Sequence, residues 1–334
     1  MRKLWQQLAA DVSAPFLAAL VLAAAYLGFV AWDQSHWWRV KDDYSFGWLV
    51  PAFVVFVVYD RWPRITAAAK ACAADGSPRA AGWHKWILRM LVGGMLVCGV
   101  GMFLLGSLYR AGSGSSHPGT LAIALGAAGI LLPLLFLNAP VAQSPARGSV
   151  ISDGRVQLVQ WFLFPALVWL VSAPMVSVLE QQISLFLLHK VVTVVAFVFD
   201  VLGLPIEQQG NVLALPKGNV GVEDACSGIR SLTACLFAGS FLAAVFLEKL
   251  WKKITLVVAA MGLAFVTNLL RGLFLTGWAY HNGPHSIEGT VHDVAGYSVL
   301  GLTVVGLLCL LPLLNLKFSA EAPRDPTPSG SSQT

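Results

Sequence analysis

Long apolar stretches separated by short polar ones dominate the chain. A stretch of about 17 to 25 mainly apolar residues can cross a hydrocarbon core of roughly 30 Å as a helix. We expect eight such crossings, at approximately Ala14 to Trp32, Gly47 to Tyr59, Trp86 to Leu108, Gly119 to Leu137, Gln157 to Val176, Ser227 to Leu247, Ile254 to Leu275 and His292 to Leu316. The second stretch is short and begins beside Pro51, so its ends are the least sharply defined.

This pattern predicts an all-α polytopic membrane protein that forms a single integral membrane domain over residues 1–334. Five spans occupy residues 1–177, and three more occupy residues 226–316. Between them, residues 178–225 are expected to form a helix and a small β-hairpin at the outer face. Residues 317–334 are rich in Pro and Ser and are expected to be a disordered tail.

One further apolar run, Ile183 to Leu204, has the length of a span but carries His189, Lys190 and Asp200. Charges inside lipid are costly unless they face a protein interior. We therefore interpret Leu179 to Leu204 as a helix at the outer interface or packed on the bundle.

Turn residues mark the segment that follows. Between Pro205 and Val222, Gly210-Asn211 and Lys217-Gly218-Asn219 separate short runs with β-branched residues. Glycine and asparagine between such runs are typical of tight turns that join strands. The segment is therefore expected to be the small hairpin between the fifth and sixth spans.

The composition excludes several classes of protein. Of 334 residues, 57% are hydrophobic and 12% are charged, against roughly 25% charged in a soluble domain. A soluble enzyme and a disordered chain are both excluded. The five cysteines lack the paired spacing of a disulfide scaffold or a zinc knuckle.

The basic residues predict the orientation of the chain. If the N-terminus is cytoplasmic, fourteen of the 22 Lys and Arg residues fall in cytoplasmic pieces and five in outer pieces. Cytoplasmic loops carry an excess of Lys and Arg. We therefore expect both termini to lie on the cytoplasmic side.

Three consecutive spans carry polar residues at a similar expected depth. Asp224, Cys226, Ser227 and Arg230 open the sixth span, Asn268 and Arg271 lie near the outer end of the seventh, and His292 and Asp293 open the eighth. The topology thus brings a thiol, a guanidinium and an imidazole to one membrane face.

These three groups suit attack on a carbonyl. A helix N-terminus and a nearby cation both favour the thiolate, and Cys226 is expected to have both. Imidazoles titrate near neutral pH, so His292 could act as general acid and base. Arg271 stays charged and could stabilise the thiolate or a developing oxyanion.

Simpler interpretations exist for each residue. A lone cysteine in a membrane helix is usually a packing residue, and this applies to Cys72, Cys98, Cys235 and Cys309. An arginine near a span end can extend to the interface, which is the alternative for Arg271 and Arg230. His292 could be a helix cap, and Asp293 could simply favour a helix start. Composition and spacing alone leave these alternatives open.

Two further histidines, His281 and His285, lie in a loop with Gly and Pro. Histidines four residues apart can bind metal, but no carboxylate or thiolate lies in register with them. We interpret both as surface residues and expect no metal site.

Several motifs together resemble the exosortase and archaeosortase family. They are Cys226-Ser227-Gly228-Ile229-Arg230-Ser231-Leu232, Asn268-Leu269-Leu270-Arg271, His292-Asp293-Val294-Ala295-Gly296-Tyr297 and, before the second span, Asp43-Tyr44-Ser45-Phe46-Gly47-Trp48-Leu49-Val50-Pro51 with Asp60-Arg61-Trp62. The ordered set of Cys, Arg and His motifs is more specific than any one of them. The similarity covers nearly the whole hydrophobic part of the chain.

The resemblance implies a multi-pass cysteine protease and transpeptidase of the bacterial inner membrane, with its active site on the extracytoplasmic face. Its substrates would be membrane-anchored proteins with a C-terminal signal made of a short motif, often Pro-Glu-Pro-like, one transmembrane helix and a basic end. The resemblance implies that, at the matching positions of this chain, Cys226 is the nucleophile and His292 is the acid and base. It implies that Arg271 stabilises the transition state or the thiolate. Arg230, Ser227, Asn268, Asp293, Asp224 and Tyr44 are expected to bind substrate or support the site. The partners would be such proteins and the lipid bilayer, with no nucleic acid and no cofactor.

The chain departs from the family pattern in two places. Phe46 stands where a histidine is usual, and Asp224 stands where glutamate commonly precedes Ala-Cys. A role for position 46 in substrate recognition is therefore in doubt.

Two other classes remain as alternatives. A transporter or lipid-handling protein would carry inverted repeats and broken helices, which the sequence does not display. A membrane scaffold without catalysis would tolerate replacement of Cys226. A metalloprotease would need H-E-x-x-H or paired glutamates, and the chain has neither.

Overall fold

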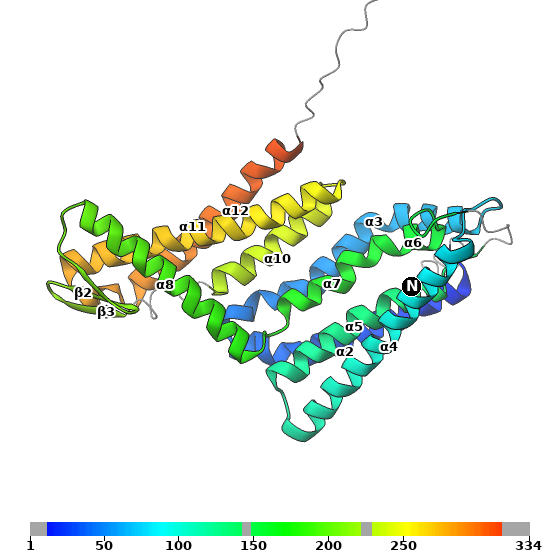
Figure 1. Cartoon of the computed structure of the whole chain (residues 1–334), viewed down its shortest axis with the longest axis horizontal. Coiled ribbons are helices and arrows are strands. Elements are labelled where there is room, and N and C mark those ends of the chain that lie inside the picture. Colours follow the sequence, from blue (N-terminus) through cyan, green and yellow to red (C-terminus); the bar gives the residue numbers. More distant parts are fainter. Residues whose placement is uncertain (1–11, 142–147, 222–228, 316–334) are drawn as a thin grey trace, which may run out of the picture.

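The computed structural model describes residues 12–141, 148–221 and 229–315 (Figure 1). In chain order the elements are α2 (Ala14–Val40), η1 (Asp42–Leu49), α3 (Val50–Ala73), α4 (Gly82–Ser113), α5 (His117–Leu137), α6 (Gly154–Val159), η2 (Gln160–Phe162), α7 (Leu163–Ser172), α8 (Ser177–Val201), β1 (Glu207–Gln209), β2 (Val212–Leu215), β3 (Gly218–Gly221), α10 (Ile229–Phe246), α11 (Leu250–Asn282), η3 (Pro284–Ile287) and α12 (Thr290–Asn315). Within these ranges, 8 helical segments are long and apolar enough to cross a membrane. The expected helical polytopic architecture is confirmed, while the side on which the termini lie stays a prediction.

The 8 candidate spans differ from the expected set in one member. The expected sixth span corresponds to α10, whose apolar part, Ser231–Phe246, falls among the helices of 10–17 residues. By length and composition α8 takes its place among the 8. However, α8 runs across the direction of α7 and α10 in Figure 1 and not alongside them. The position of α8 at the outer interface or packed on the bundle stays a prediction.

Several helices, among them α3 and α11, extend beyond their expected ends. The second span continues to Ala73, because the guanidinium of Arg61 lies buried in the bundle and not in a loop. Arg61 donates hydrogen bonds to the carbonyls of Trp161, at 3.4 Å, and of Ala244 in the last turn of α10. The seventh span continues past Leu275 to Asn282. Arg271 therefore lies about 17 Å below the end of α11, and not within one turn of it.

The N-terminal bundle is built around α5. In the apolar stretch of α5, 67% of the residues are buried, against 11% in that of α4. The helix α5 therefore lies inside the bundle, and α4 lies at its edge. Some buried polar groups of this bundle bind other parts of the protein, since lipid offers them no partner. The side chain of Gln34 on α2 donates to the carbonyl of Trp169 at 3.0 Å and accepts from Ser172 at 2.8 Å. These contacts join α2 to α7.

A small antiparallel sheet follows α8. The expected hairpin is present and gains one more strand, in the order β1-β2-β3. Leu213 and Val220 pair across β2 and β3 and are buried with Val191 of α8 and Leu275 of α11. Figure 1 places this sheet beside α11, far from α4. The sheet, α8 and the C-terminal half of α11 thus share one hydrophobic core, separate from that of the N-terminal bundle.

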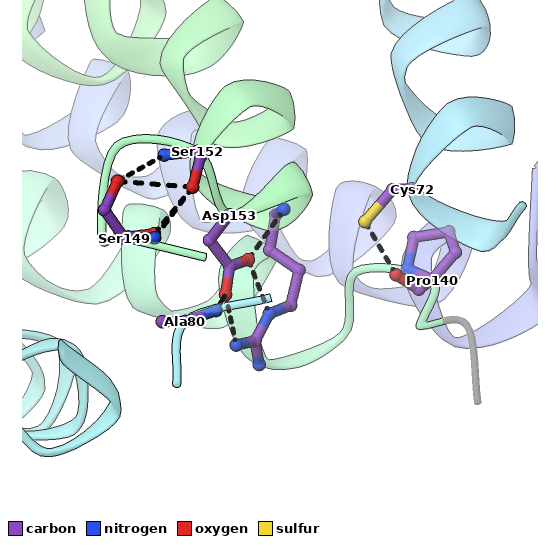
Figure 2. Close-up of polar contacts among 7 residues, drawn as sticks. Cys72, Ala80, Pro140, Ser149, Ser152 and Asp153 are labelled. Carbon is purple, nitrogen blue, oxygen red and sulfur yellow. Dashed lines mark hydrogen bonds and ion pairs between the residues drawn. The ribbon is translucent and has the colours of Figure 1, made fainter. Parts of the chain in front are cut away.

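A second polar cluster joins the loops on the side that we expect to be cytoplasmic (Figure 2). Asp153 caps α6 and is fully buried. Its carboxylate accepts hydrogen bonds from the backbone N–H of Ala80 at 3.0 Å and from the Arg155 guanidinium at 2.8 and 3.0 Å. Burial raises the pKa of Asp153, but these hydrogen bonds outweigh it and hold the pKa below its ordinary value.

Candidate active site

Two expected site residues meet between α11 and α12. The Arg271 guanidinium nitrogen Nη2 lies 2.9 Å from Nε2 of His292. Arg271 is at the end of the sixth turn of α11, and His292 is in the first turn of α12. Sequence analysis predicted that these helices bring both side chains to one depth, and the structure places them in contact.

The direction of this hydrogen bond follows from the chemistry of arginine. A guanidinium carries only donors and does not deprotonate in proteins. In this contact Nε2 of His292 can therefore act only as the acceptor. On the other side of the ring, Nδ1 lies 3.6 Å from Oδ1 of Asp293, which is too long for a hydrogen bond but close enough for electrostatic attraction.

Small and polar residues hold α11 and α12 in this register. Thr267 and Thr303 are both buried, and their hydroxyl oxygens lie 3.0 Å apart across the two helices. Gly296 lies one turn after His292, and a Cβ placed there would be 3.7 Å from Nη2 of Arg271. The absence of a side chain at Gly296 leaves room for the guanidinium against α12.

The side chains of His292 and Asp293 are both partly exposed, which suits a chemical role better than a packing role. The His292 side chain is 37% exposed, and that of Asp293 is 70% exposed. Asn268, one turn before Arg271 on α11, is buried. The imidazole is thus partly exposed, while Asn268 beside Arg271 is buried.

Three expected site residues, Cys226, Ser227 and Asp224, lie outside the described residues, and for Arg230 only the backbone is described, in α10. The three residue steps from Cys226 to Ile229 can cover at most about 11 Å. Ile229 is buried at the start of α10.

The segment η1 connects the first two long helices to α10. The hydroxyl of Tyr44 is buried and accepts a hydrogen bond from the backbone N–H of Met175 at 3.0 Å, so it anchors the chain between α7 and α8. The hydroxyl of Thr233 on α10 donates to the carbonyl of Asp43 at 3.1 Å. Phe46 stacks on Phe237 of α10, with ring centroids 5.3 Å apart. Phe46, for which a role in substrate recognition was in doubt, therefore serves as a packing residue between η1 and α10.

A polar cleft of about 400 Å³ lies where η1, α8 and α10 meet. Lys41 and Glu180 form an ion pair of 2.8 Å in its wall, and Ile229 also lines it. Sequence analysis missed this pair, although both residues lie at the ends of apolar stretches, where charged groups lie close to an interface. The cleft lies next to the first described residue of α10.

The chain matches the model of a known protein family. The model of the transmembrane exosortase family matches residues 37–309, which is most of the chain. The chain belongs to this family. No curated protein and no solved structure matches it.

Membership identifies this exosortase as a multi-pass membrane protein of a family associated in general with membrane transpeptidase or protease activity. The matched range includes α11 and the start of α12, and so it includes both Arg271 and His292.

Proposed function

We propose that this exosortase is a cysteine transpeptidase or protease that acts at the outer face of the membrane. Its substrates would be anchored proteins that carry a short motif, one transmembrane helix and a basic end. The contact of 2.9 Å between Arg271 and His292 supports this proposal most directly, because it pairs a permanent cation with a titratable base. Cys226 supplies the nucleophile.

The first half of the reaction forms a thioester. The thiol proton of Cys226 passes to Nε2 of His292, and the sulfur bonds to the scissile carbonyl carbon. Once Nε2 is protonated it no longer accepts from Arg271, so the guanidinium is released toward the negative carbonyl oxygen. The carbon–nitrogen bond then breaks, and the departing nitrogen takes the proton from His292.

The second half resolves the thioester. An acceptor amine, or water, gives a proton to His292 as it attacks the thioester carbon. The carbon–sulfur bond breaks, and Cys226 regains a proton from His292. The product is a new amide when an amine attacks, or a free carboxylate when water attacks.

The substrate helix would approach from within the bilayer. An apolar groove of about 1000 Å³ runs between α2 and α3, with α5 and α7 also lining it. It extends from Leu17 to Ala31 on α2, about 21 Å along the helix axis. A groove of this kind also suits a lipid chain, which is the observation that favours the alternative of a lipid-handling protein without catalysis.

Replacement of the nucleophile tests the proposal. With a co-encoded anchored protein as substrate, Cys226→Ala should leave the substrate at full length, detected by immunoblot of the membrane fraction. Cys235→Ala is the matched control, because Cys235 lies buried in α10, which follows Cys226 in the chain, and it should retain processing. Processing by the Cys226→Ala variant would refute the enzyme assignment and favour the lipid-handling alternative.

Thiol labelling of intact cells tests the exposure of the nucleophile. Cys72 and Cys235 are buried, Cys98 lies in the middle of α4, and Cys309 lies in the last third of α12, toward the side expected to be cytoplasmic. A membrane-impermeant maleimide should therefore label Cys226 alone. Labelling that persists in the Cys226→Ala variant would contradict the assigned face.

A further inference from the structure

The strand β3 forms one edge of the small sheet. In the described part of the chain, its ladder partner is β2, and β2 lies between β1 and β3. An edge strand presents backbone N–H and C=O groups that can pair with another extended chain. The two edges of this sheet, formed by β1 and β3, lie on opposite sides of β2.

One face of the sheet lies against α8. Gln208 of β1 pairs with Leu213, so its side chain is on the face that packs on α8. It extends to the hydroxyl of Thr193 on α8, at 3.5 Å, and to the carbonyl of Gly210 at 3.0 Å. The contact with α8 is thus made by a face of the sheet.

The register of the hairpin identifies which groups of β3 point outward. Leu215 pairs with Gly218 across a turn of two residues, so this pair closes the hairpin with hydrogen bonds. Bonded and non-bonded pairs alternate along an antiparallel ladder. The backbone groups of Asn219 and Gly221 therefore point away from β2, and the Asn219 side chain is exposed.

Both expected catalytic segments leave from this place. The chain leaves β3 at Gly221, and Cys226 follows within five residue steps, at most about 18 Å. The face of β3 packs on η3, where a Cβ on Gly218 would lie 3.0 Å from Pro284. From Ile287, the end of η3, His292 follows after another five residue steps. Chain length therefore keeps Cys226 within about 18 Å of the end of β3, and His292 within about 18 Å of the end of η3.

We propose that the edge of β3 binds the extended segment of the substrate next to the scissile bond, as a fourth strand of the sheet. This inference rests on the proposed function. An open strand edge is complementary to an extended polypeptide backbone, and pairing would fix the direction of the substrate chain. Because the contacts are to backbone, they tolerate different side chains in the substrate.

The length of β3 favours a tethered substrate over a second copy of the exosortase. The strand has 4 residues, and only alternate ones face outward. Each backbone hydrogen bond contributes only modestly to binding, which is little for the association of two free proteins. A substrate that is already held in the membrane by its own helix needs only such a weak additional contact.

Proline substitution tests the edge in the full-length exosortase with the anchored substrate. Asn219→Pro removes one outward N–H, and it should raise the half-saturating substrate level about tenfold while the maximal rate changes little. Asn219→Ala keeps the N–H and should stay within about twofold of wild type. Gln208→Pro makes the same backbone change at the other edge and should also stay within about twofold.

Alkylation of Cys226 by iodoacetamide reports on the integrity of the catalytic centre in each variant. The rate for Asn219→Pro should equal that of wild type, because the change lies outside the site. Wild-type processing by Asn219→Pro would overturn the inference. Equal losses for Asn219→Pro and Asn219→Ala would overturn it too, since the side chain would then be what binds. Equal losses for both proline variants would also overturn it.

Photo-crosslinking identifies the occupant directly. In the Cys226→Ala background, Asn219→benzoylphenylalanine should capture full-length substrate, and Gln208→benzoylphenylalanine should not. Capture of a second exosortase at position 219, in place of substrate, would overturn the inference. If Cys226→Ala itself processes substrate, the proposed function fails. If Cys226→Ala is inactive and only the results at Asn219 depart from expectation, the edge inference alone fails.

Discussion

Two helix starts in this molecule combine an aspartate with a cationic or titratable side chain, and they differ in how completely the aspartate is satisfied. Asp153 at the start of α6 is fully buried and accepts hydrogen bonds from Ala80 and Arg155. Asp293 in the first turn of α12 is 70% exposed and lies 3.6 Å from the ring of His292. The first cluster is closed, and the second is open.

The difference separates stability from chemistry. At Asp153 every donor is fixed by the fold, so no proton can move without breaking the loops apart. At His292 one ring nitrogen accepts from Arg271 and the other faces a solvated carboxylate. Changes in the closed cluster should therefore lower the stability of the protein, and changes in the open cluster should lower its activity.

The largest expected effect concerns the base itself. His292→Gln should lower the rate of substrate processing by about 10² to 10⁴-fold, the usual contribution of a general acid and base. The unfolding temperature in detergent should stay near that of wild type, because the side chain is 37% exposed. A variant that unfolds early while its folded fraction keeps full activity would reverse the comparison.

The next effect concerns the closed cluster. Asp153→Ala leaves the Arg155 guanidinium without its anion and should lower the free energy of unfolding by about 3 to 5 kcal/mol. Thermal unfolding followed by fluorescence measures this loss. The processing rate per folded molecule should be unchanged, and a selective loss of rate with full stability would show that the cluster takes part in the reaction.

The space beside the guanidinium offers a test of intermediate size. Gly296→Leu should displace Arg271 and lower the processing rate more than about tenfold, a transition-state cost above 1.4 kcal/mol. Gly296→Ala is the matched control, since its Cβ would lie at an ordinary contact distance of 3.7 Å from Nη2. Equal processing rates for Gly296→Leu and Gly296→Ala would show that the function of Arg271 does not depend on the space beside Gly296.

A smaller effect follows from the lowered pKa of Asp153. Because the folded pKa lies below the ordinary value of about 3.9, the carboxylate stabilises the fold fully above that pH and loses its contribution as pH falls through the folded pKa. The difference in unfolding temperature between wild type and Asp153→Asn should be constant from about pH 7 to 5 and shrink below about 4. A difference that grows in acid would contradict the assigned direction.

The smallest effect is expected at Asp293. Its attraction to His292 is solvent-exposed, so Asp293→Asn should change the processing rate by only a few fold, consistent with an interaction of at most about 1 kcal/mol. The pH profile of the rate measures the effect more sensitively than a single rate. A loss comparable with that of His292→Gln would make Asp293 as important as the base.

Hydropathy predicted most of this fold, because a bilayer leaves few alternatives to apolar helices. It failed where tertiary contacts satisfy charged groups. Arg61 indicated a loop after Tyr59, yet carbonyls from two other helices bind its guanidinium and the helix continues to Ala73. The third strand of the sheet was also missed, since its residues Gly218–Gly221 include two glycines and one asparagine and have low strand propensity.

At the site, residue types and order predicted that Arg271 and His292 share one depth. The sequence could not predict that Nε2 is the atom that Arg271 contacts, because this depends on side-chain torsions. It also could not predict the space left by Gly296, which depends on the approach of α12 to α11. The roles of Cys226, Ser227 and Asp224 stay predictions.

The extension of α11 limits which proteins can be cleaved. Because Arg271 lies about 17 Å below the tip of α11, a folded domain that rests on this tip cannot itself touch the guanidinium. About five extended residues are needed to cover that distance. Under the proposed function, a cargo protein therefore needs an unfolded spacer of at least this length between its last folded residue and its cleavage point, whatever the sequence of that spacer.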